Sequence, residues 1–242
     1  MAGLEKWLPQ DVLDKFEVYN YNHAAEILTE SFPNELNEII NALRSIKINI
    51  EDLKKAGGNE SPIPPKFAEI LEPQNWMEIK ISGDLIVKLY PRKGKKKSVF
   101  DDKPFEIRTI EDFIDGHNID FVKNRVALDI EWNSKDQTYD RDLFAMRTYY
   151  ECGVVSVGVI ITRSEDLNDV FRKVYALDSK TGKWSPIFPK YGASTTWMGK
   201  LIPRLDSRRH GGCPILAIGL RKICIDDWSN DYCDEHDPAR HK

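Results

Sequence analysis

Two acidic residues alternate with apolar ones in the segment Val-Ala-Leu-Asp-Ile-Glu-Trp, residues 126–132. If this segment is a half-buried β-strand, Asp129 and Glu131 share one face, where their charges repel each other. Asp120 lies nine residues before Asp129, a spacing that a tight turn can close. Three converging acids would suit a hard, oxygen-seeking cation such as Mg2+. The alternative is an exposed sheet face with solvated acids, because the spacing D-x8-D-x-E is a loose pattern.

The elements around this segment predict an α/β protein in which helices flank a mixed central β-sheet. The segment Gly153–Thr162 is nearly continuously apolar, which is typical of a strand covered on both faces. Pro214–Gly219 is expected to form a last buried strand. Trp76–Ser82 and Leu85–Tyr90 are expected to pair with each other as a hairpin. The apolar stripe of Glu35–Ile48 predicts a helix that serves either as a core layer or as a dimer interface.

Other helices are expected near the N-terminus, around residues 12–16 and 22–29, and later in the chain. A helix over Arg141–Cys152 would direct Leu143, Phe144 and Tyr150 inward. Ser164 is expected to cap a helix that ends near residue 174. Residues 56–65 are expected to form a loop and 178–200 to be loop-rich. The segment 101–118 is acidic and is expected to end in a turn, Asp115-Gly-His-Asn118, that leads into the central strand. The tail from residue 226 is expected to fray.

The composition is that of a globular protein, with 242 residues, 41% hydrophobic and 31% charged. We expect one domain over 1–242, with an N-terminal helical part (1–55), a sheet-containing core (76–225) and a tail (226–242). The net charge of -4 excludes a globally basic nucleic-acid binder, although a local basic surface can still contact phosphates. The chain shows neither an apolar run of about 20 residues nor a signal-peptide pattern, so we expect a cytoplasmic protein without a membrane partner.

The cysteines and histidines near the C-terminus form two short pairs, His210-x2-Cys213 and Cys233-x2-His236, with Cys224 between them. This spacing is compatible with a structural zinc site. The alternative is that the cysteines are reduced thiols and that Cys213 and Cys224 are small core residues beside an apolar strand.

Several segments resemble the BglII/BstYI family of type II restriction endonucleases, which has the PD-(D/E)XK nuclease fold. They are Ile119–Trp132, Asp142–Phe144 and Gly158–Arg163, with weaker similarity over 194–220. Tyr21–Leu28 resembles an N-terminal helix of the same family. The resemblance implies a restriction-endonuclease-like core with N-terminal helices and a single nuclease domain.

The resemblance also implies an active site. Asp120 and Asp129 would bind Mg2+ together with the backbone carbonyl of Ile130, and Glu131 would hold or deprotonate the attacking water. The widespread nuclease pattern has lysine at the last position and the family has glutamine, whereas BamHI, a related enzyme, also has glutamate. Asp129 is one methylene shorter than the glutamate usual in the family. Candidates for a further acid are Glu106 and Glu111.

In the relatives, the residues just after the central strand enter the major groove, which implies that Asn133, Ser134, Lys135, Asp136 and Gln137 read bases here. An ordinary polar turn is the alternative. Further candidates for DNA contact are in two basic clusters and one small-residue segment: Lys95 and Lys96; Arg204, Arg208 and Arg209; and Gly192–Thr196.

The function implied is Mg2+-dependent, sequence-specific hydrolysis of double-stranded DNA by a homodimer, in which a two-fold protein meets a two-fold site. A cognate DNA methyltransferase would protect host sites. Two alternatives stay open: a catalytically inactive DNA-binding protein on the same scaffold, and a protein that uses an acidic strand only structurally.

Overall fold

The computed structural model describes residues 3–55, 61–95, 99–114, 116–178 and 181–238. The chain divides into two compact units. The first combines Met1–Glu78 with Ile119–Lys242, and the second is Ile79–Asn118. The second unit is therefore an insertion between two parts of the first.

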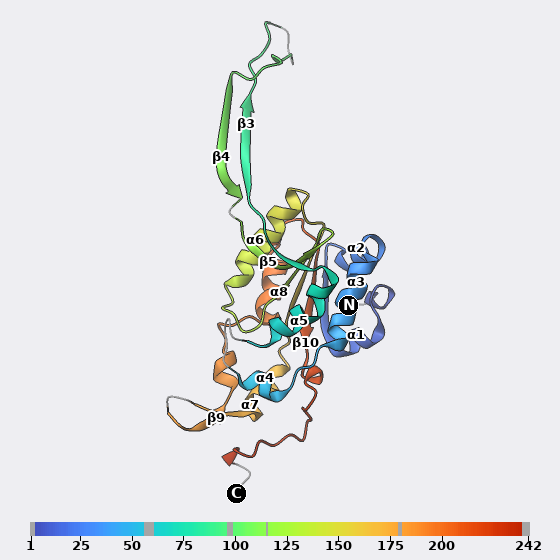
Figure 1. Cartoon of the computed structure of the whole chain (residues 1–242), viewed down its shortest axis with the longest axis vertical. Coiled ribbons are helices and arrows are strands. Elements are labelled where there is room, and N and C mark those ends of the chain that lie inside the picture. Colours follow the sequence, from blue (N-terminus) through green and yellow to red (C-terminus); the bar gives the residue numbers. More distant parts are fainter. Residues whose placement is uncertain (1–2, 56–60, 96–98, 115, 179–180, 239–242) are drawn as a thin grey trace. The chain divides into compact units, whose positions relative to one another are not determined.

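Within the described residues, the first unit is built on a six-stranded sheet (Figure 1). Its strands, in spatial order, are β1 (Phe16–Tyr21), β10 (Ile215–Leu220), β7 (Val157–Arg163), β6 (Val126–Ile130), β5 (Asn118–Lys123) and β2 (Met77–Lys80). The strands β10, β7 and β6 are parallel to one another, while β1 runs antiparallel to β10 and β5 runs antiparallel to β6. The predicted mixed central sheet is confirmed.

Helices cover both faces of this sheet (Figure 1). One face shares a core with helices that include α2 (Ala24–Ser31), α3 (Pro33–Ser45), α5 (Ile63–Leu71) and α7 (Leu167–Lys173). The other face packs against α6 (Thr138–Glu151) and α8 (Met198–Asp206). On that second face, Met146 of α6 lies against Gly158 of β7, and Met198 of α8 lies against Gly219 of β10.

The remaining described elements are short. They are η1 (Leu4–Lys6), α1 (Gln10–Lys15), α4 (Ile50–Lys54), η3 (Glu72–Gln74), β8 (Tyr175–Leu177), β9 (Trp184–Pro186), η4 (Phe188–Tyr191) and η5 (Lys222–Cys224). No helix in the described part of the chain has the length and apolarity to cross a bilayer.

Strand β6 is buried along its whole length, so the expectation of a half-buried strand is wrong. The alternation itself holds: Leu128 and Ile130 join the core of α2, α3 and α5. The opposite face of the sheet is covered by α6 and α8, which explains why Asp129 is only 4% exposed. A pattern of alternating residues reports which side chains share a face, but not whether another layer covers it.

Helix α3 carries its apolar stripe into the core, where it contacts α1, α2 and α5. This finding favours the core-layer interpretation over a dimer interface. On α6, Leu143 is buried as expected, but Phe144 is 66% exposed and Tyr150 is 37% exposed. The expectation for those two aromatic side chains is wrong, because only one stripe of α6 faces the sheet.

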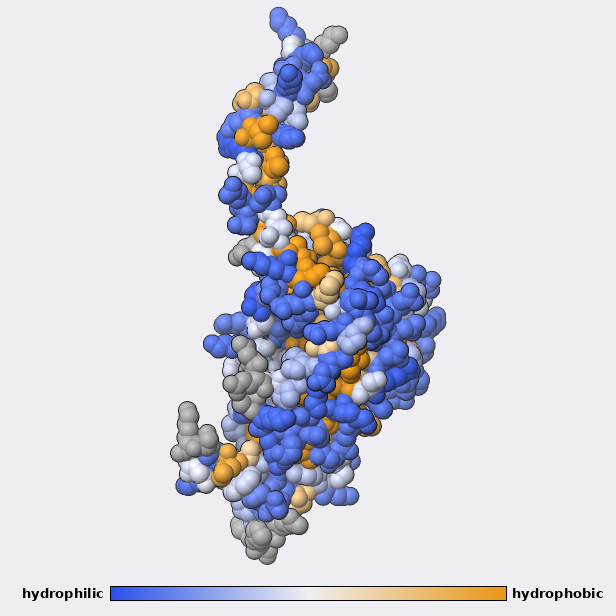
Figure 2. Space-filling view, viewed as in Figure 1, coloured by the Kyte–Doolittle hydropathy of each residue, from blue (hydrophilic) through white to orange (hydrophobic). Residues whose placement is uncertain are grey.

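The second unit contains a two-stranded antiparallel ribbon of β3 (Gly83–Leu89) and β4 (Glu106–Ile114). The predicted hairpin between the segments at 76–82 and 85–90 is therefore wrong in its pairing, since β2 joins the central sheet and β3 pairs with β4. Alternating apolar residues identified the strands but not their partners. Apolar side chains line the ribbon (Figure 2), and several are more than 45% exposed: Ile86, Phe105, Ile107, Ile110 and Phe113.

Three further expectations need correction. Phe16 begins strand β1 instead of ending a helix, because the alternating segment 16–21 pairs with β10. Ser164 does not cap α7; its hydroxyl donates to the Glu17 carboxylate at 2.6 Å, and α7 begins at Leu167. The tail does not fray over residues 226–238, since the Asp234 carboxylate is buried and accepts from the Tyr175 N–H.

Candidate active site

The acidic centre is built on the β5–β6 hairpin. Its turn residues Asn124 and Arg125 both have positive φ, 46° and 74°, as a tight two-residue connection between twisted antiparallel strands requires. The register pairs Phe121 with Leu128 and so places Asp120 opposite Asp129. The predicted tight turn thus brings the two aspartates together.

Two hydrogen bonds fix this pair. The Asp120 N–H donates to Asp129 Oδ1 at 3.0 Å, and the Ile130 N–H donates to Asp120 Oδ2 at 2.9 Å. Each carboxylate therefore accepts a main-chain bond from the opposite strand. The arrangement holds both acids at the carboxyl end of β6, next to the Ile130 carbonyl.

Glu131 follows directly at the end of β6. Its N–H donates to the Ile161 carbonyl at 2.9 Å, and its own carbonyl accepts from the Thr162 hydroxyl at 2.8 Å. These main-chain bonds fix the position from which the 8% exposed side chain extends.

Asp142 of α6 is a fourth acid in this centre, and sequence reasoning did not assign it a role. It is 1% exposed, and its carboxylate interacts with Glu131 and raises the pKa of Asp129. Asp142 lies in Asp142–Phe144, a segment that resembles the family, and this resemblance is the feature of the sequence that could have indicated a role for Asp142. Its proximity to β6 depends on how α6 packs on the sheet.

Burial dominates the electrostatics of these acids. Desolvation raises the pKa of Asp129 well above its ordinary value, and the neighbouring charges of Asp142 and Asp120 raise it further. Burial likewise raises the pKa of Glu131 and of Asp142. A cation lies beside this centre: Arg141 Nε is 3.7 Å from Asp142, and the Arg141 side chain is mostly exposed. The mutual repulsion and burial of these acids therefore disfavour their ionised forms in the ion-free protein.

The donor set fits a divalent cation. Asp129 Oδ2 and Glu131 Oε2 are buried and make no hydrogen bond to any described residue. Buried polar atoms are usually satisfied, so such orphaned oxygens need an explanation, and a bound ion provides one. No three His, Cys, Asp or Glu side chains in the described ranges converge on one metal position. Two carboxylates plus the Ile130 carbonyl, completed by water, match the preference of Mg2+ for few protein ligands.

The zinc alternative is not supported, since no group of three His, Cys, Asp or Glu side chains that could hold a metal ion is present among the described residues. The buried His210 contacts the Cys213 carbonyl through Nδ1 at 2.7 Å, while the Cys224 thiol faces the Lys15 carbonyl. Burial raises the pKa of both thiols, to about 12 for Cys213 and about 11 for Cys224. These features favour the interpretation of the two cysteines as small core residues.

A cleft of about 1070 Å³ opens over the acidic centre. Its walls include Asp120 and Glu131, the segment 132–135, and the cation Arg141. Helix α5 contributes Pro64, Pro65 and Ala68 to the cleft. The cleft thus joins the acids to both a basic and an apolar wall.

Two acids that precede Asp120 also line this cleft, namely Glu72 and Glu78. The predicted candidates for a further acid, Glu106 and Glu111, lie instead on β4 in the second unit, where Glu106 accepts from Arg108 Nε. The two predicted candidates are closer to Asp120 in the sequence than Glu72 and Glu78 are. The structure nevertheless places Glu72 of η3 and Glu78 of β2, not the predicted acids, in the same cleft as Asp120.

The residues after β6 form a well-defined segment. Asn133 adopts a left-handed backbone, with φ 62°, and is 8% exposed, and its Oδ1 makes no hydrogen bond within the described chain. Lys135 and Gln137 are exposed, while Ser134 and Asp136 are half-buried. Strained backbone with an orphaned polar atom is common at functional sites.

This segment is paired with another candidate segment, residues 192–196. Three hydrogen bonds connect them: Asp136 N–H to the Ser194 carbonyl (2.9 Å), Thr196 N–H to the Ser134 carbonyl (2.8 Å), and Ser134 N–H to the Thr196 hydroxyl (3.1 Å). Lys135 and Thr195 form an antiparallel bridge. We call residues 133–137 and 192–196 together the loop pair.

The basic candidates have different environments. Arg204 donates to both carboxylate oxygens of Asp140, at 3.0 and 3.1 Å, and Arg209 also contacts Asp140. These bonds lower the pKa of Asp140. Arg208 is exposed on the turn after α8. Lys95 is exposed in the second unit, and Lys96 lies outside the described residues.

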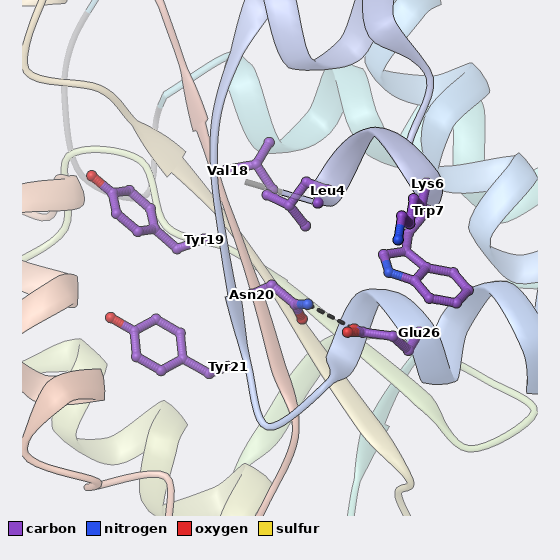
Figure 3. A pocket seen from close by; sticks show the side chains of 9 residues that line it. Leu4, Lys6, Trp7, Val18, Tyr19, Asn20, Tyr21 and Glu26 are labelled. Atoms are coloured by element: carbon purple, nitrogen blue, oxygen red, sulfur yellow. Dashed lines mark hydrogen bonds between the residues drawn. The ribbon is translucent and has the colours of Figure 1, made fainter. Parts of the chain in front are cut away.

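A smaller cleft of about 460 Å³ lies beside β1 and η1 (Figure 3). Its polar groups include Lys6, Asn20 and Glu26, and the Asn20 amide donates to the Glu26 carboxylate at 2.7 Å. Tyr19 and Tyr21 point to the opposite side of the strand from Val18 and Asn20 (Figure 3). Since its acid is already hydrogen-bonded and no second acid lines it, this cleft lacks the features of the acidic centre.

A family model described as restriction endonuclease BglII/BglIII matches residues 16–220, from the first residue of β1 to the last residue of β10. The match covers the β5–β6 hairpin, Asp142 and the loop pair. No curated protein matches the chain at a significant level.

Proposed function

Because the chain belongs to the BglII/BglIII restriction endonuclease family, we propose that it is a type II enzyme that hydrolyses double-stranded DNA at a specific sequence with Mg2+. The observation that carries this proposal is the pair of buried oxygens without a described hydrogen-bond partner, Asp129 Oδ2 and Glu131 Oε2, of which Glu131 lines a cleft large enough to admit a phosphodiester.

Asp120, Asp129 and the Ile130 carbonyl would hold the ion. When bound, Mg2+ polarises the scissile phosphate and lowers the pKa of a water molecule. The hydrogen bonds from the main chain of the opposite strand keep the two aspartates in place before the ion arrives.

Glu131 receives the proton of the attacking water on its orphaned oxygen. Burial raises the pKa of this carboxyl group in the ion-free protein, and the positive charge of a bound ion beside it would favour the ionised form that accepts the proton. Attack of the water oxygen on phosphorus breaks the bond to the leaving sugar oxygen. Glutamate thus stands where the family has glutamine, whose amide can position a water molecule but cannot accept its proton, while Asp142 of α6 interacts with the Glu131 carboxyl group.

The loop pair reads the base edges, with Asn133, Lys135 and Gln137 as the main donors to guanine and adenine. Arg141 and Lys135 flank the acids and attract the phosphates on either side of the scissile bond. Lys95, Lys96 and Arg208 add non-specific phosphate contacts. Arg204 and Arg209 act indirectly, by fixing Asp140 at the start of α6.

A homodimer would present two such sites to a two-fold DNA sequence, so that both strands are cut. An enzyme of this kind acts in the cytoplasm beside a DNA methyltransferase that modifies the same sequence in the host genome.

The test is digestion of unmethylated plasmid and genomic DNA in Mg2+ by the wild type and by Asp120→Asn and Asp129→Asn. We expect discrete fragments from the wild type and loss of cleavage in both variants. Asp11→Asn is the matched control, since Asp11 pairs with Arg44 on an exposed surface outside the cleft. Sequencing the fragment ends gives the recognition site. Undiminished cleavage by both cleft variants would refute the assignment.

The substitution of the family glutamine by Glu131 also favours a second candidate, an inactive DNA-binding protein. This candidate predicts a gel shift with duplex DNA in Ca2+ but no nicking in Mg2+ or Mn2+. A wild type that cleaves under either condition eliminates it.

A further inference from the structure

Arg163, the last residue of β7, is a buried cation that forms no ion pair with any described residue. It is 1% exposed, and no carboxylate of a described residue lies within ion-pair distance. Burying a guanidinium without an opposite charge is costly, and the cost shows in the pKa of Arg163, which burial lowers to about 10. Such a residue needs a structural or functional reason.

The contacts of Arg163 connect the sheet to one half of the loop pair. Its Nη2 donates to the Tyr191 carbonyl at 3.1 Å and to the Thr195 hydroxyl at 2.7 Å. The guanidinium carbon lies 5.5 Å from the centroids of both the Phe171 and Tyr191 rings, which stack on each other at 3.8 Å. Arg163 therefore fixes both ends of the turn 191–195.

Thr195 relays this position to the other half of the loop pair. Its hydroxyl donates to the Gly192 carbonyl at 2.7 Å while it accepts from Arg163, so the turn is closed on itself. The same residue forms the bridge with Lys135, next to the Thr196–Ser134 hydrogen bond. A shift of Thr195 would thus move residues 133–137, the segment that follows β6.

We infer that Arg163 is a positioning residue for sequence discrimination: it holds the turn 191–195 so that residues 133–137 meet the base edges in one geometry. The inference rests on the proposed function. Arginine suits this role because its planar group lies beside the edges of the two stacked rings, where its Nη2 reaches both the Tyr191 carbonyl and the Thr195 hydroxyl. A lysine keeps the charge but lacks the planar group.

The experiment compares kcat/KM on the recognition sequence, determined beforehand from the cleaved ends, with kcat/KM on duplexes altered at one base pair. The variants are Arg163→Lys, Arg163→Met and Thr195→Val. Arg172→Lys is the matched control, because Arg172 also lies over an aromatic ring, Phe188 at 4.7 Å, but is exposed and contacts neither half of the loop pair.

We expect the ratio of cognate to altered cleavage to fall at least about tenfold in Arg163→Lys and Thr195→Val, the size of losing one well-placed base contact. The loss should appear in KM for the cognate duplex more than in kcat, since the acids are untouched. The double variant Arg163→Lys/Thr195→Val should lose no more than the larger single loss, because both changes break one contact.

Arg163→Met removes the buried charge and tests how much that charge destabilises the fold. This variant should lose discrimination between cognate and altered duplexes, whether or not its Tm rises. Unchanged discrimination in Arg163→Lys and Thr195→Val, with only a lower Tm, would overturn the inference and leave a structural role. Should the Arg163 variants fail to fold, Thr195→Val decides alone. A wild type that neither cleaves nor discriminates among duplexes instead refutes the proposed function.

Discussion

The acids at the end of β6 and those around the start of α6 are close in sequence and differ in almost every physical respect. Asp129 and Glu131 are buried with orphaned oxygens and raised pKa values. Asp136 and Asp140 are half-buried and pair with cations, and the pKa of Asp140 is lowered. The first group destabilises the fold in the absence of an ion, while the second holds α6 and α8 together.

The comparison shows that the hydrogen-bond and ion-pair partners of a carboxylate indicate its function better than the exposed fraction of its side chain does. Arg204 and Arg209 satisfy Asp140 completely, leaving little for a ligand to gain. At β6 the fold supplies main-chain donors to Asp120 and Asp129, but among the described residues Asp129 Oδ2 and Glu131 Oε2 have no hydrogen-bond partner. Unsatisfied charge is what a metal and a phosphate can use.

The same chemical change should have opposite effects in the two groups. Asp129→Asn should reduce Mg2+-dependent cleavage by about three orders of magnitude, because metal catalysis contributes several kcal/mol. It should also raise the Tm in EDTA, since it removes a buried charge. Asp140→Asn should lower the Tm and retain cleavage. Digestion assays and thermal melts of both variants check this, and a stabilised but active Asp129→Asn would contradict the comparison.

Divalent ions should stabilise only the first group. At an ion concentration of about 100 times Kd, the wild type should gain about 2.7 kcal/mol in unfolding free energy. Asp120→Asn and Asp129→Asn should lose most of this gain, whereas Asp140→Asn should keep it. Melts in EDTA, Mg2+, Mn2+ and Ca2+ measure the effect, and an equal gain in all variants would place the ion elsewhere.

The pH dependence of stability should have opposite signs in the two groups. Folded Glu131 and Asp142 have raised pKa values, so between pH about 5 and 8 the folded state holds protons that the unfolded state has lost. In EDTA the unfolding free energy should therefore fall as pH rises, by up to about 1.4 kcal/mol per pH unit for each retained proton. Asp140, with its lowered pKa, adds stability that is lost only below pH about 4.

Urea denaturation at three pH values measures this slope, and Glu131→Gln combined with Asp142→Asn should flatten it. A slope that is unchanged in the double variant would show that other groups cause it.

The smallest effect is expected from replacing the arginines that pair with Asp140. Arg204→Met should lower the unfolding free energy by about 1 kcal/mol, because it breaks a half-buried bidentate pair and leaves Asp140 to Arg209. Arg209→Met, at a more exposed side chain, should cost less. Chemical denaturation measures the unfolding free energy of both variants. A larger loss in Arg209→Met than in Arg204→Met would show that Arg209 is the more important partner of Asp140.

The sequence predicted the sheet, most of the helices, and the meeting of Asp120 with Asp129, because hairpin spacing and family resemblance are local signals. It did not predict Asp142 as part of the acidic centre or the contacts of Arg163. Both depend on how α6 and the turn 191–195 pack on β6 and β7, which local patterns do not encode. The β3–β4 pairing was missed for the same reason, since an apolar alternation does not name its partner strand.

The place of the insertion has a practical consequence. The insertion, residues 79–118, begins within β2 and ends at the first residue of β5, and these two strands are neighbours in the same sheet. Both ends of the excursion are therefore anchored by the core. We expect that a protease cut between β3 and β4 would yield two polypeptides that remain associated and copurify. The protein could therefore be expressed as two separate fragments that have no activity until they associate.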